Sequence, residues 1–254
     1  MAFTLNSTST TAQSLTTVTD IGVVTANGAL VTSGTAVNIS GNGAFLLNDG
    51  LIASISFCIS ASANFSLMNS GLITTENTGI NINFASVPVT TTSITNSGEI
   101  VSTMSSAIVC AEAGLNVQNS GLISGRSTAI NLSSSDLTAI NRINNSGVIE
   151  VLATTTIESA INANGSTRLT NTGTIISLVN LGEGADLIDL SSTAFVPTSF
   201  VGTQSFLGGT TPSFGITKAP GQITLRADFT GDGVADFHVT IRGASTLNLS
   251  DFLL

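Results

Sequence analysis

The sequence has few of the side chains that recognise charged or aromatic partners. Tryptophan and tyrosine are absent, and charged residues make up only 8% of the 254 positions. Six basic side chains stand against 15 acidic ones, which gives a formal net charge of −9. Nucleic-acid binding depends on a basic surface that neutralises phosphates, and so does binding to an anionic lipid surface. We therefore expect neither kind of partner.

Long hydrophobic runs are missing as well. No uninterrupted apolar segment approaches the roughly 20 residues of a membrane-spanning helix, so we expect no membrane insertion. The opening MAFTLNSTST has neither the basic region nor the apolar core of a Sec-type signal peptide. Mean hydropathy is nevertheless +0.45, whereas disordered chains combine low hydropathy with high charge. The chain should therefore fold, with a surface rich in hydroxyl and amide groups.

A short phrase is repeated along most of the chain. Asn-Ser-Gly-Leu-Ile occurs at Asn69–Ile73 and again at Asn119–Ile123, with close variants before and after. Its glycine recurs every 21 to 27 residues, a period typical of solenoid repeat proteins. The glycines are Gly50, Gly71, Gly98, Gly121, Gly147 and Gly173, and a fainter copy lies at Asn27–Val31.

Each copy has the pattern of a strand, a tight corner and a second strand. An apolar residue lies two positions before the asparagine and an isoleucine two positions after the glycine, as in Leu67 and Ile73. A second phrase lies about midway between copies, for example at Thr128–Ser133, and alternates with the period of a half-buried strand. The sequence thus predicts an all-β fold, a parallel β-helix of about seven coils over residues 21–180, with residues 1–20 as a cap or arm.

Two other repetitive folds fit less well. A β-sandwich would also show short strands but not a recurring identical corner, and the LxxLxLxxN frame of a leucine-rich repeat is absent. The corner repeats resemble those of right-handed parallel β-helices of the pectate-lyase type and of the passenger stalks of bacterial surface proteins. This resemblance implies a right-handed solenoid. It lies in the corners and not in any enzyme motif.

The corner residues have an expected chemistry. Glycine allows a positive φ without a Cβ penalty, and asparagine tolerates the left-handed region. Stacked asparagines can also pair their side-chain amides from coil to coil, which satisfies buried polar groups along a ladder. The members of this predicted ladder are Asn48, Asn69, Asn96, Asn119, Asn145 and Asn171.

Cysteine and histidine are too sparse for most metal or nucleophile chemistry. Cys58 and Cys110 lie about two repeats apart, so stacking at about 4.8 Å per coil separates their Cα atoms by roughly 10 Å. A disulfide requires a separation below about 7 Å, so we expect two buried thiols. His238 has no serine or aspartate partner in a recognisable motif, and no hydrolytic triad is predicted.

From about residue 181 the repeat stops and the composition changes. Gly182, Gly184 and Asp186 form a GxGxD unit, Asp228–Asp236 is a DFTGDGVAD loop, and the chain ends in Asp251, Phe252, Leu253 and Leu254. These motifs, in this order, resemble the C-terminal module of serralysin-type proteases and other RTX proteins. The resemblance implies a small β-rich, calcium-binding module over residues 181–254. It also implies an uncleaved secretion signal in the last four residues, export by a type I secretion apparatus, and an extracellular or cell-surface location in a Gram-negative bacterium.

The chain departs from that family in two respects. Only one GxGxD unit is present, whereas an RTX roll shares each calcium ion between successive turns. The HExxH zinc motif of the proteases is absent, so only the export module carries over.

The DFTGDGVAD loop has the oxygen spacing of a calcium site. Carboxylate, hydroxyl and carbonyl oxygens at alternate positions suit Ca²⁺, a hard cation. Position 12 is Val239 and not glutamate, so the loop is not an EF-hand. The candidate ligands are Asp228, Thr230, Asp232, the Val234 carbonyl and Asp236, together with Asp186 and Asp189.

The repeats do not show the clustered acids of a polysaccharide-cleaving enzyme. Measured from the corner glycine, only Glu112 and Asp136 nearly coincide on adjacent coils. Arg142 and Arg168 each lie five residues before their glycine, so they should stack on an outward face. We expect no enzyme activity.

The leading functional hypothesis is a secreted structural protein that assembles with itself into a surface layer, fibre or matrix, with help from calcium. Open ends of a β-helix carry strand edges that can pair with further chains. The alternative is an adhesin or a glycan- or ice-binding solenoid that contacts, for example, cell-surface polysaccharide. A polysaccharide-degrading enzyme is less favoured.

Overall fold

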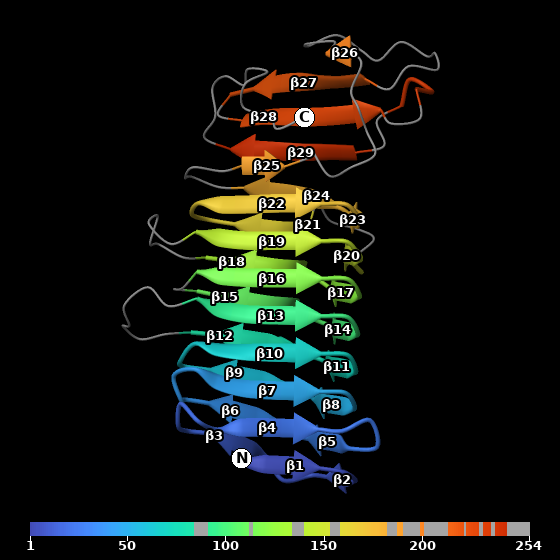
Figure 1. Ribbon diagram of the computed structural model, residues 1–254. Coiled ribbons are helices and arrows are strands. Elements are labelled where there is room, and N and C mark those ends of the chain that lie inside the picture. Colours follow the sequence, from blue (N-terminus) through green and yellow to red (C-terminus); the bar gives the residue numbers. More distant parts are fainter. Residues whose placement is uncertain are drawn as a thin grey trace.

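The computed structural model is a solenoid in which the chain winds through three β-sheets (Figure 1). Described are residues 1–83, 91–111, 114–133, 140–152, 158–181, 187–189, 199–200, 213–220, 222–228, 231–234 and 237–242. Successive strands enter successive sheets, and each pairs in parallel with the strand one coil further on. The predicted all-β parallel solenoid of about seven repeat-bearing coils is confirmed. Within the described ranges, no helix has the length and apolarity needed to span a membrane.

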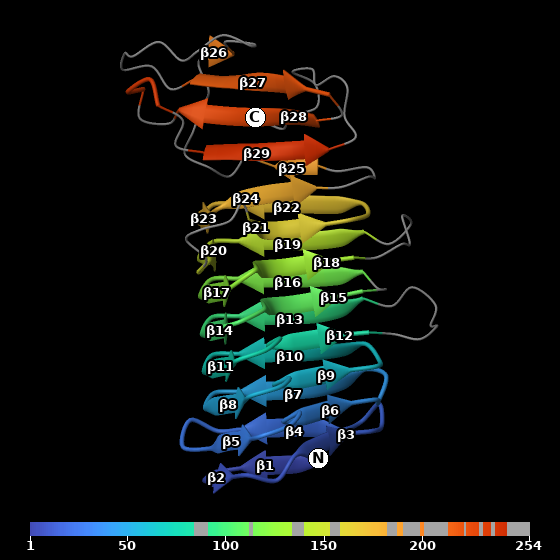
Figure 2. The same cartoon turned by 180° about the vertical axis from the view of Figure 1, so that it is seen from behind.

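The three sheets run along the axis of the solenoid, and in Figure 1 sheet A lies in front of sheet C, with sheet B at one edge (Figure 2 shows the reverse view). Sheet A contains β1 (Phe3–Leu5), β4 (Ile21–Val24), β7 (Ala44–Asn48), β10 (Phe65–Asn69), β13 (Thr92–Asn96), β16 (Leu115–Asn119), β19 (Asn141–Asn145), β22 (Thr167–Asn171) and β25 (Leu187–Asp189). Sheet B contains β2 (Thr8–Ser9), β5 (Ala29–Thr32), β8 (Leu51–Ser54), β11 (Leu72–Thr75), β14 (Glu99–Ser102), β17 (Leu122–Gly125), β20 (Val148–Val151) and β23 (Thr174–Ile176). Sheet C contains β3 (Gln13–Leu15), β6 (Val37–Ile39), β9 (Ile59–Ala61), β12 (Ile80–Ile82), β15 (Ser106–Cys110), β18 (Thr128–Leu132), β21 (Ser159–Ala163), β24 (Leu178–Leu181), β29 (Phe237–Arg242), β28 (Gln222–Asp228), β27 (Ser213–Ala219) and β26 (Ser199–Phe200).

The repeated phrase forms the corner between sheets A and B. The residue two positions before each asparagine points inward from sheet A, and the isoleucine after each glycine points inward from sheet B, as Leu67 and Ile73 do. Sheet C contributes a third inward column that includes Ile80 and Ile130. These three aliphatic columns are buried, apart from the partly buried Ile175, and form one continuous core. Because side chains alternate between the two faces of a strand, the same pattern leaves every second residue on the outside.

Glycine is required at the corner for a reason other than the predicted one. None of the phrase glycines is among the positive-φ residues, and the only non-glycine described with a positive φ is Ser177. The predictions of a positive-φ glycine and a left-handed asparagine are therefore wrong. Instead, a Cβ on Gly71 would lie 2.1 Å from the carbonyl oxygen of Gly50, and one on Gly98 would lie 2.1 Å from that of Gly71. The coils approach so closely at this corner that only a residue without a side chain fits.

The first 20 residues form a complete extra coil. Their three strands β1, β2 and β3 pair in parallel with β4, β5 and β6, so they cover one end of the repeat-bearing coils. We number coils from this end, with β1–β3 as coil 1 and β19–β21 as coil 7. In coil 2, Val24 stands in register with Asn48, so the asparagine of the fainter copy, Asn27, lies outside the ladder.

The C-terminal segment extends sheet C. Strand β29 pairs in parallel with β24, and β28 and β27 then continue the sheet as antiparallel strands (Figure 2). Phe214, Ile216 and Leu225 from these strands belong to the same buried cluster as the solenoid core. The described part of residues 181–254 is therefore β-structure stacked on the solenoid, with a core continuous with that of the repeats.

We predict that Gly98→Ala destabilises the protein by about 1–3 kcal/mol, the usual cost of forcing an added methyl group into a packed site. The obstructing atom is a backbone oxygen held in the coil-to-coil ladder, so it cannot move aside easily. Urea unfolding followed by circular dichroism measures the change. Gly34→Ala is the matched control, because a Cβ there meets nothing within 4 Å. Equal midpoints for the two variants would contradict the close-approach explanation.

Candidate functional site

The six phrase asparagines form a continuous hydrogen-bonded ladder inside the corner. Asn48 Nδ2 donates to Asn69 Oδ1 at 2.7 Å, and Asn96 Nδ2 donates to Asn119 Oδ1 at 2.8 Å. The bonds from Asn69, Asn119 and Asn145 to the next members are each 2.7 Å. From Asn69 onward each Nδ2 also donates to the carbonyl of the glycine two residues later. The ladder therefore fixes both the corner and the alignment of adjacent coils.

The ladder has a defined first member. Asn48 Oδ1 is buried and has no hydrogen-bond partner among the described residues, because Val24 occupies the equivalent place in the preceding coil. Every later member has an amide donating to its oxygen. A buried acceptor without a donor costs about 1–3 kcal/mol. The first member of the ladder thus has an unpaired side-chain oxygen, whereas the side-chain oxygen of every later member is paired.

A second, shorter ladder was not predicted from the sequence. Asn162 Nδ2 donates to Asn131 Oδ1 at 3.1 Å, and Asn180 Nδ2 donates to Asn162 Oδ1 at 2.7 Å. These residues lie on the outer side of sheet C, in register across β18, β21 and β24. The signal was the asparagine shared by TAINLS and SAINAN. Its outward position suggested a solvated side chain and not a paired one.

The predicted calcium loop is a turn held by its own carboxylates. Asp228 is fully buried, and its Oδ1 and Oδ2 accept hydrogen bonds from the Gly231 and Gly233 amides at 2.6 Å and 2.8 Å. Asp232 is exposed, and its Oδ1 accepts from the Val234 amide at 2.8 Å. Both glycines have positive φ, 73° and 92°, which a tight turn of this kind needs. The turn therefore presents Asp232 on its outer side and anchors Asp228 on its inner side.

The donor chemistry of this turn fits a calcium ion, as far as the described residues extend. Asp228, Asp232 and the Val234 carbonyl carry hard oxygens of the kind that Ca²⁺ prefers, and both Asp228 oxygens also accept hydrogen bonds from backbone amides. The other predicted ligands Thr230, Asp236 and Asp186, and the predicted secretion signal Asp251–Leu254, lie outside the described residues. Asp189 lies in β25, but its side chain is not described. Across the described residues, no three His, Cys, Asp or Glu side chains gather in one place.

The acids of the repeats are dispersed where the structure describes them. Glu99 and Glu150 both lie on the outer side of sheet B, but β17 separates their strands and they occupy different rows. Glu150 accepts a hydrogen bond from Ser124 Oγ at 3.1 Å. The pair that nearly coincided in register, Glu112 and Asp136, lies outside the described residues, and the side chain of His238 is not described.

Both cysteines are buried, and neither forms a disulfide. The Cys58 thiol donates to the Thr74 carbonyl at 3.0 Å, and burial raises its pKa to about 12. At neutral pH this sulfur is a protonated core group and not a nucleophile, since reactivity requires the thiolate.

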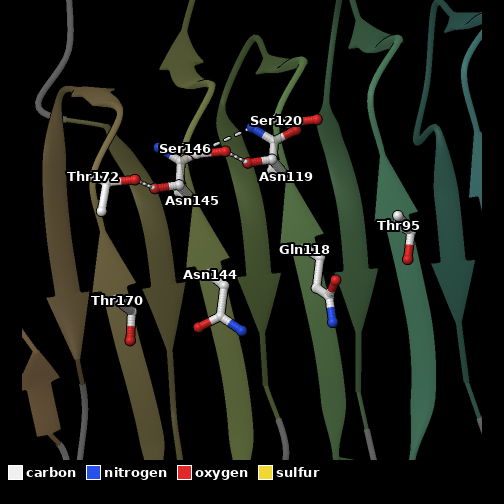
Figure 3. Close-up of a pocket in the computed structure, with 9 residues that line it drawn as sticks. All are labelled: Thr95, Gln118, Asn119, Ser120, Asn144, Asn145, Ser146, Thr170 and Thr172. Carbon is white, nitrogen blue, oxygen red and sulfur yellow. Dashed lines mark hydrogen bonds between the residues drawn. The ribbon is translucent and has the colours of Figure 1, made fainter. Parts of the chain in front are cut away.

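A shallow groove of about 410 Å³ follows the outer side of sheet A across coils 5 to 8. Figure 3 shows two rows of side chains over neighbouring parallel strands. The row over the strands contains Thr95, Gln118, Asn144 and Thr170. The row at the corner contains Ser120, Ser146 and Thr172. All are amides or hydroxyls, so the groove can exchange hydrogen bonds with a polar ligand but offers no aromatic ring for stacking.

The outward side chains of sheet A, which we call the A face, change in character along the solenoid. In coils 2 to 4 they are mostly apolar, and they include Ile21, Val23, Phe45, Leu47 and Met68. Beyond the polar residues of coils 5 and 6 come Arg142 and Arg168, exposed and in register as predicted.

The outward side chains of sheet B, which we call the B face, are largely aliphatic and carry acids. One row contains Leu51, Leu72, Glu99, Leu122 and Val148, and a second contains Val31, Ala53, Thr74, Val101, Ser124 and Glu150.

The fold and these surfaces define the protein as a parallel β-solenoid of the asparagine-ladder kind. Comparison of the chain with protein-family models, curated proteins and solved structures gave no match.

We predict that Asn96→Leu, in the middle of the ladder, costs about 2–4 kcal/mol of stability. The substitution leaves the buried Asn119 Oδ1 without its donor and removes an acceptor from Asn69 Nδ2. The end member serves as the comparison: Asn48→Leu removes a residue whose own oxygen is already unpartnered, so it should cost less. Chemical unfolding of both variants tests the ranking. A larger loss of stability for Asn48→Leu than for Asn96→Leu would contradict this description of Asn48 as the unpaired first member of the ladder.

Proposed function

We propose that this protein is a secreted structural unit that assembles end to end into an extracellular fibre, layer or matrix. The observation that carries the proposal is the edge formed by coil 1. Each of β1, β2 and β3 is the outermost strand of its sheet and pairs with a described strand on one side only. Three parallel edges therefore point in one direction at one end of the solenoid.

The sequence of coil 1 lacks the usual protection of such edges. Natural edge strands are commonly blunted by charged side chains or proline. Residues 1–19 contain no Lys, Arg, Asp, Glu or Pro. Exposed positions on the three edge strands are hydroxyl-bearing, namely Thr4, Thr8 and Ser14. A strand that docks on one of these edges would extend that sheet at the same coil spacing, about 4.8 Å.

Export and calcium binding belong to the proposal through the tail. The GxGxD unit, the DFTGDGVAD loop and the final Asp-Phe-Leu-Leu support type I secretion from a Gram-negative cell. The Asp228 turn supports calcium binding, because Asp228, Asp232 and the Val234 carbonyl lie within one loop. Calcium outside the cell would then stabilise the tail after export, since a metal that binds only the folded state adds its binding free energy to folding.

The groove over coils 5 to 8 favours a second candidate function, adhesion to a glycan. Its amide and hydroxyl rows supply the donors and acceptors that sugars bind. An ice-binding surface is less supported, because a flat row of threonines is interrupted here by Gln118 and Asn144.

We predict that three lysines on the edge strands, Thr4→Lys, Thr8→Lys and Ser14→Lys, abolish end-to-end assembly without unfolding the chain. Charged side chains on an edge oppose the approach of a second edge, and exposed surface substitutions usually change stability by less than about 0.5 kcal/mol. Negative-stain electron microscopy scores filament length, and circular dichroism checks the fold.

The matched control places the same three charges on interior coils away from the A and B faces, as Asn38→Lys, Ser62→Lys and Asn83→Lys, all at exposed positions. The control should retain filaments. If the wild-type chain stays monomeric at every concentration, or if both triple variants behave alike, end-to-end assembly by the coil 1 edge is refuted.

We also predict that Ca²⁺, but not Mg²⁺, raises the melting temperature and that Asp232→Asn removes most of this increase. Saturation at about 100 times Kd would add about 2.7 kcal/mol to a single-site protein. Asp232 is chosen because it is exposed, whereas Asp228 also holds the turn. Glu76→Gln removes an equivalent exposed charge elsewhere and should leave the calcium response intact. An equal calcium response in both variants would argue against the site.

A further inference from the structure

Two outer faces of the solenoid carry rows of exposed and half-buried aliphatic side chains. On the A face, Ile21 and Met68 are 40% and 48% exposed. On the B face, Val31 and Ile176 are 39% and 52% exposed, and the half-buried leucines at 51, 72 and 122 lie between them. Exposed apolar patches mark interfaces, because docking removes their apolar atoms from water.

The apolar parts of the two faces occupy the same coils. The A-face residues Val23, Leu47 and Met68 lie in coils 2 to 4. The B-face residues Val31, Leu51 and Leu72 lie in the same three coils. Both rows repeat at the coil spacing of about 4.8 Å. Two solenoids with parallel axes and no axial shift would therefore bring these rows opposite each other.

The charges of the two faces are also matched in height. Arg142 lies on the A face in β19 of coil 7, and Arg168 lies directly beyond it in β22. Glu150 lies on the B face in β20, which belongs to coil 7 as well. The same unshifted arrangement that pairs the apolar rows therefore brings the arginines toward Glu150 of the neighbour.

Charge also selects this pairing over the symmetric ones. Two B faces would bring only carboxylates, Glu99 and Glu150, into a shared apolar contact, and the described part of that face has no basic residue to balance them. Two A faces in the same register would place Arg142 and Arg168 against their own copies. Like charges in a desolvated interface are unfavourable, so opposite faces fit better than identical ones.

We propose that the A face of one copy docks on the B face of a second copy, with parallel axes and coils in register. This inference rests on the proposed self-assembly and adds a lateral contact to the axial one. Such a contact is heterologous, because each copy uses two different faces, so each copy can bind a neighbour on either side. End-to-end growth then yields filaments, and the A-to-B contact joins solenoids sideways into wider ribbons or layers.

Charge reversal on one face at a time tests the pairing. Variant X carries Arg142→Glu and Arg168→Glu on the A face, and variant Y carries Glu150→Arg on the B face. Each variant alone would place like charges in the contact, so we expect filaments one solenoid wide. An equimolar mixture should recover wild-type width, because both kinds of X-to-Y contact pair opposite charges. Arg126→Glu, an exposed reversal at the corner between β17 and β18, is the control and should leave the width unchanged.

Filament width and length, measured by electron microscopy, separate the two proposals. Wide wild-type assemblies, narrow X and Y filaments and a wide mixture support the inference. The lateral contact is refuted if X and Y are as wide as the wild type, if their mixture stays narrow, or if the wild type forms only single-solenoid filaments. The last result leaves end-to-end assembly standing, whereas wild-type chains that form no filaments refute the proposed function itself. At 1 M salt, where the Debye length falls to about 3 Å, the differences among wild type, X and Y should shrink.

Discussion

Parallel pairing between the backbone of one coil and that of the next is the constraint on which the rest of the structure depends. It fixes a spacing of about 4.8 Å along the solenoid, so any residue at a given corner lies directly over its counterpart. Side chains at such a position must either be absent, as at Gly71 and Gly98, or bond to copies of themselves, as Asn69 and Asn96 do. The repeated phrase meets this requirement, because it supplies a glycine and a self-pairing asparagine at each corner.

The same stacking gives the protein its surface. Inward columns of leucine, isoleucine and valine form one continuous buried core, and the groove described above lies on the outer side of sheet A. Rows on the outer faces repeat with the coils, and their composition changes only slowly along the axis. The A face passes from apolar to amide to basic, while the B face stays aliphatic with two acids. Rows of this kind would offer an extended partner repeated contacts at the coil spacing.

The C-terminal segment pairs its strands in antiparallel fashion, unlike the repeats, but it continues one of the same sheets. Its antiparallel strands β27, β28 and β29 join sheet C through β24, and apolar side chains of β27 and β28 belong to the same core. The Asp228 turn connects β28 to β29 and is held by two positive-φ glycines. A ligand that stabilises this turn would therefore act on the sheet that runs the length of the solenoid.

The sequence alone determined the solenoid, its coil number and the members of the asparagine ladder, because a corner that stacks on itself must be written identically in every coil. It also placed Arg142 over Arg168, since equal offsets from the corner imply equal positions. Only the tertiary structure decided why glycine is needed, because the obstructing oxygen of Gly50 belongs to another coil, 21 residues away from Gly71. The extra coil of residues 1–20, the outer ladder of Asn131, Asn162 and Asn180, and the joining of the tail to sheet C likewise depend on contacts between segments that share no phrase. The structure also decided which outward rows of the A and B faces lie at the same height along the axis. This alignment depends on the short corner that joins sheets A and B within each folded coil.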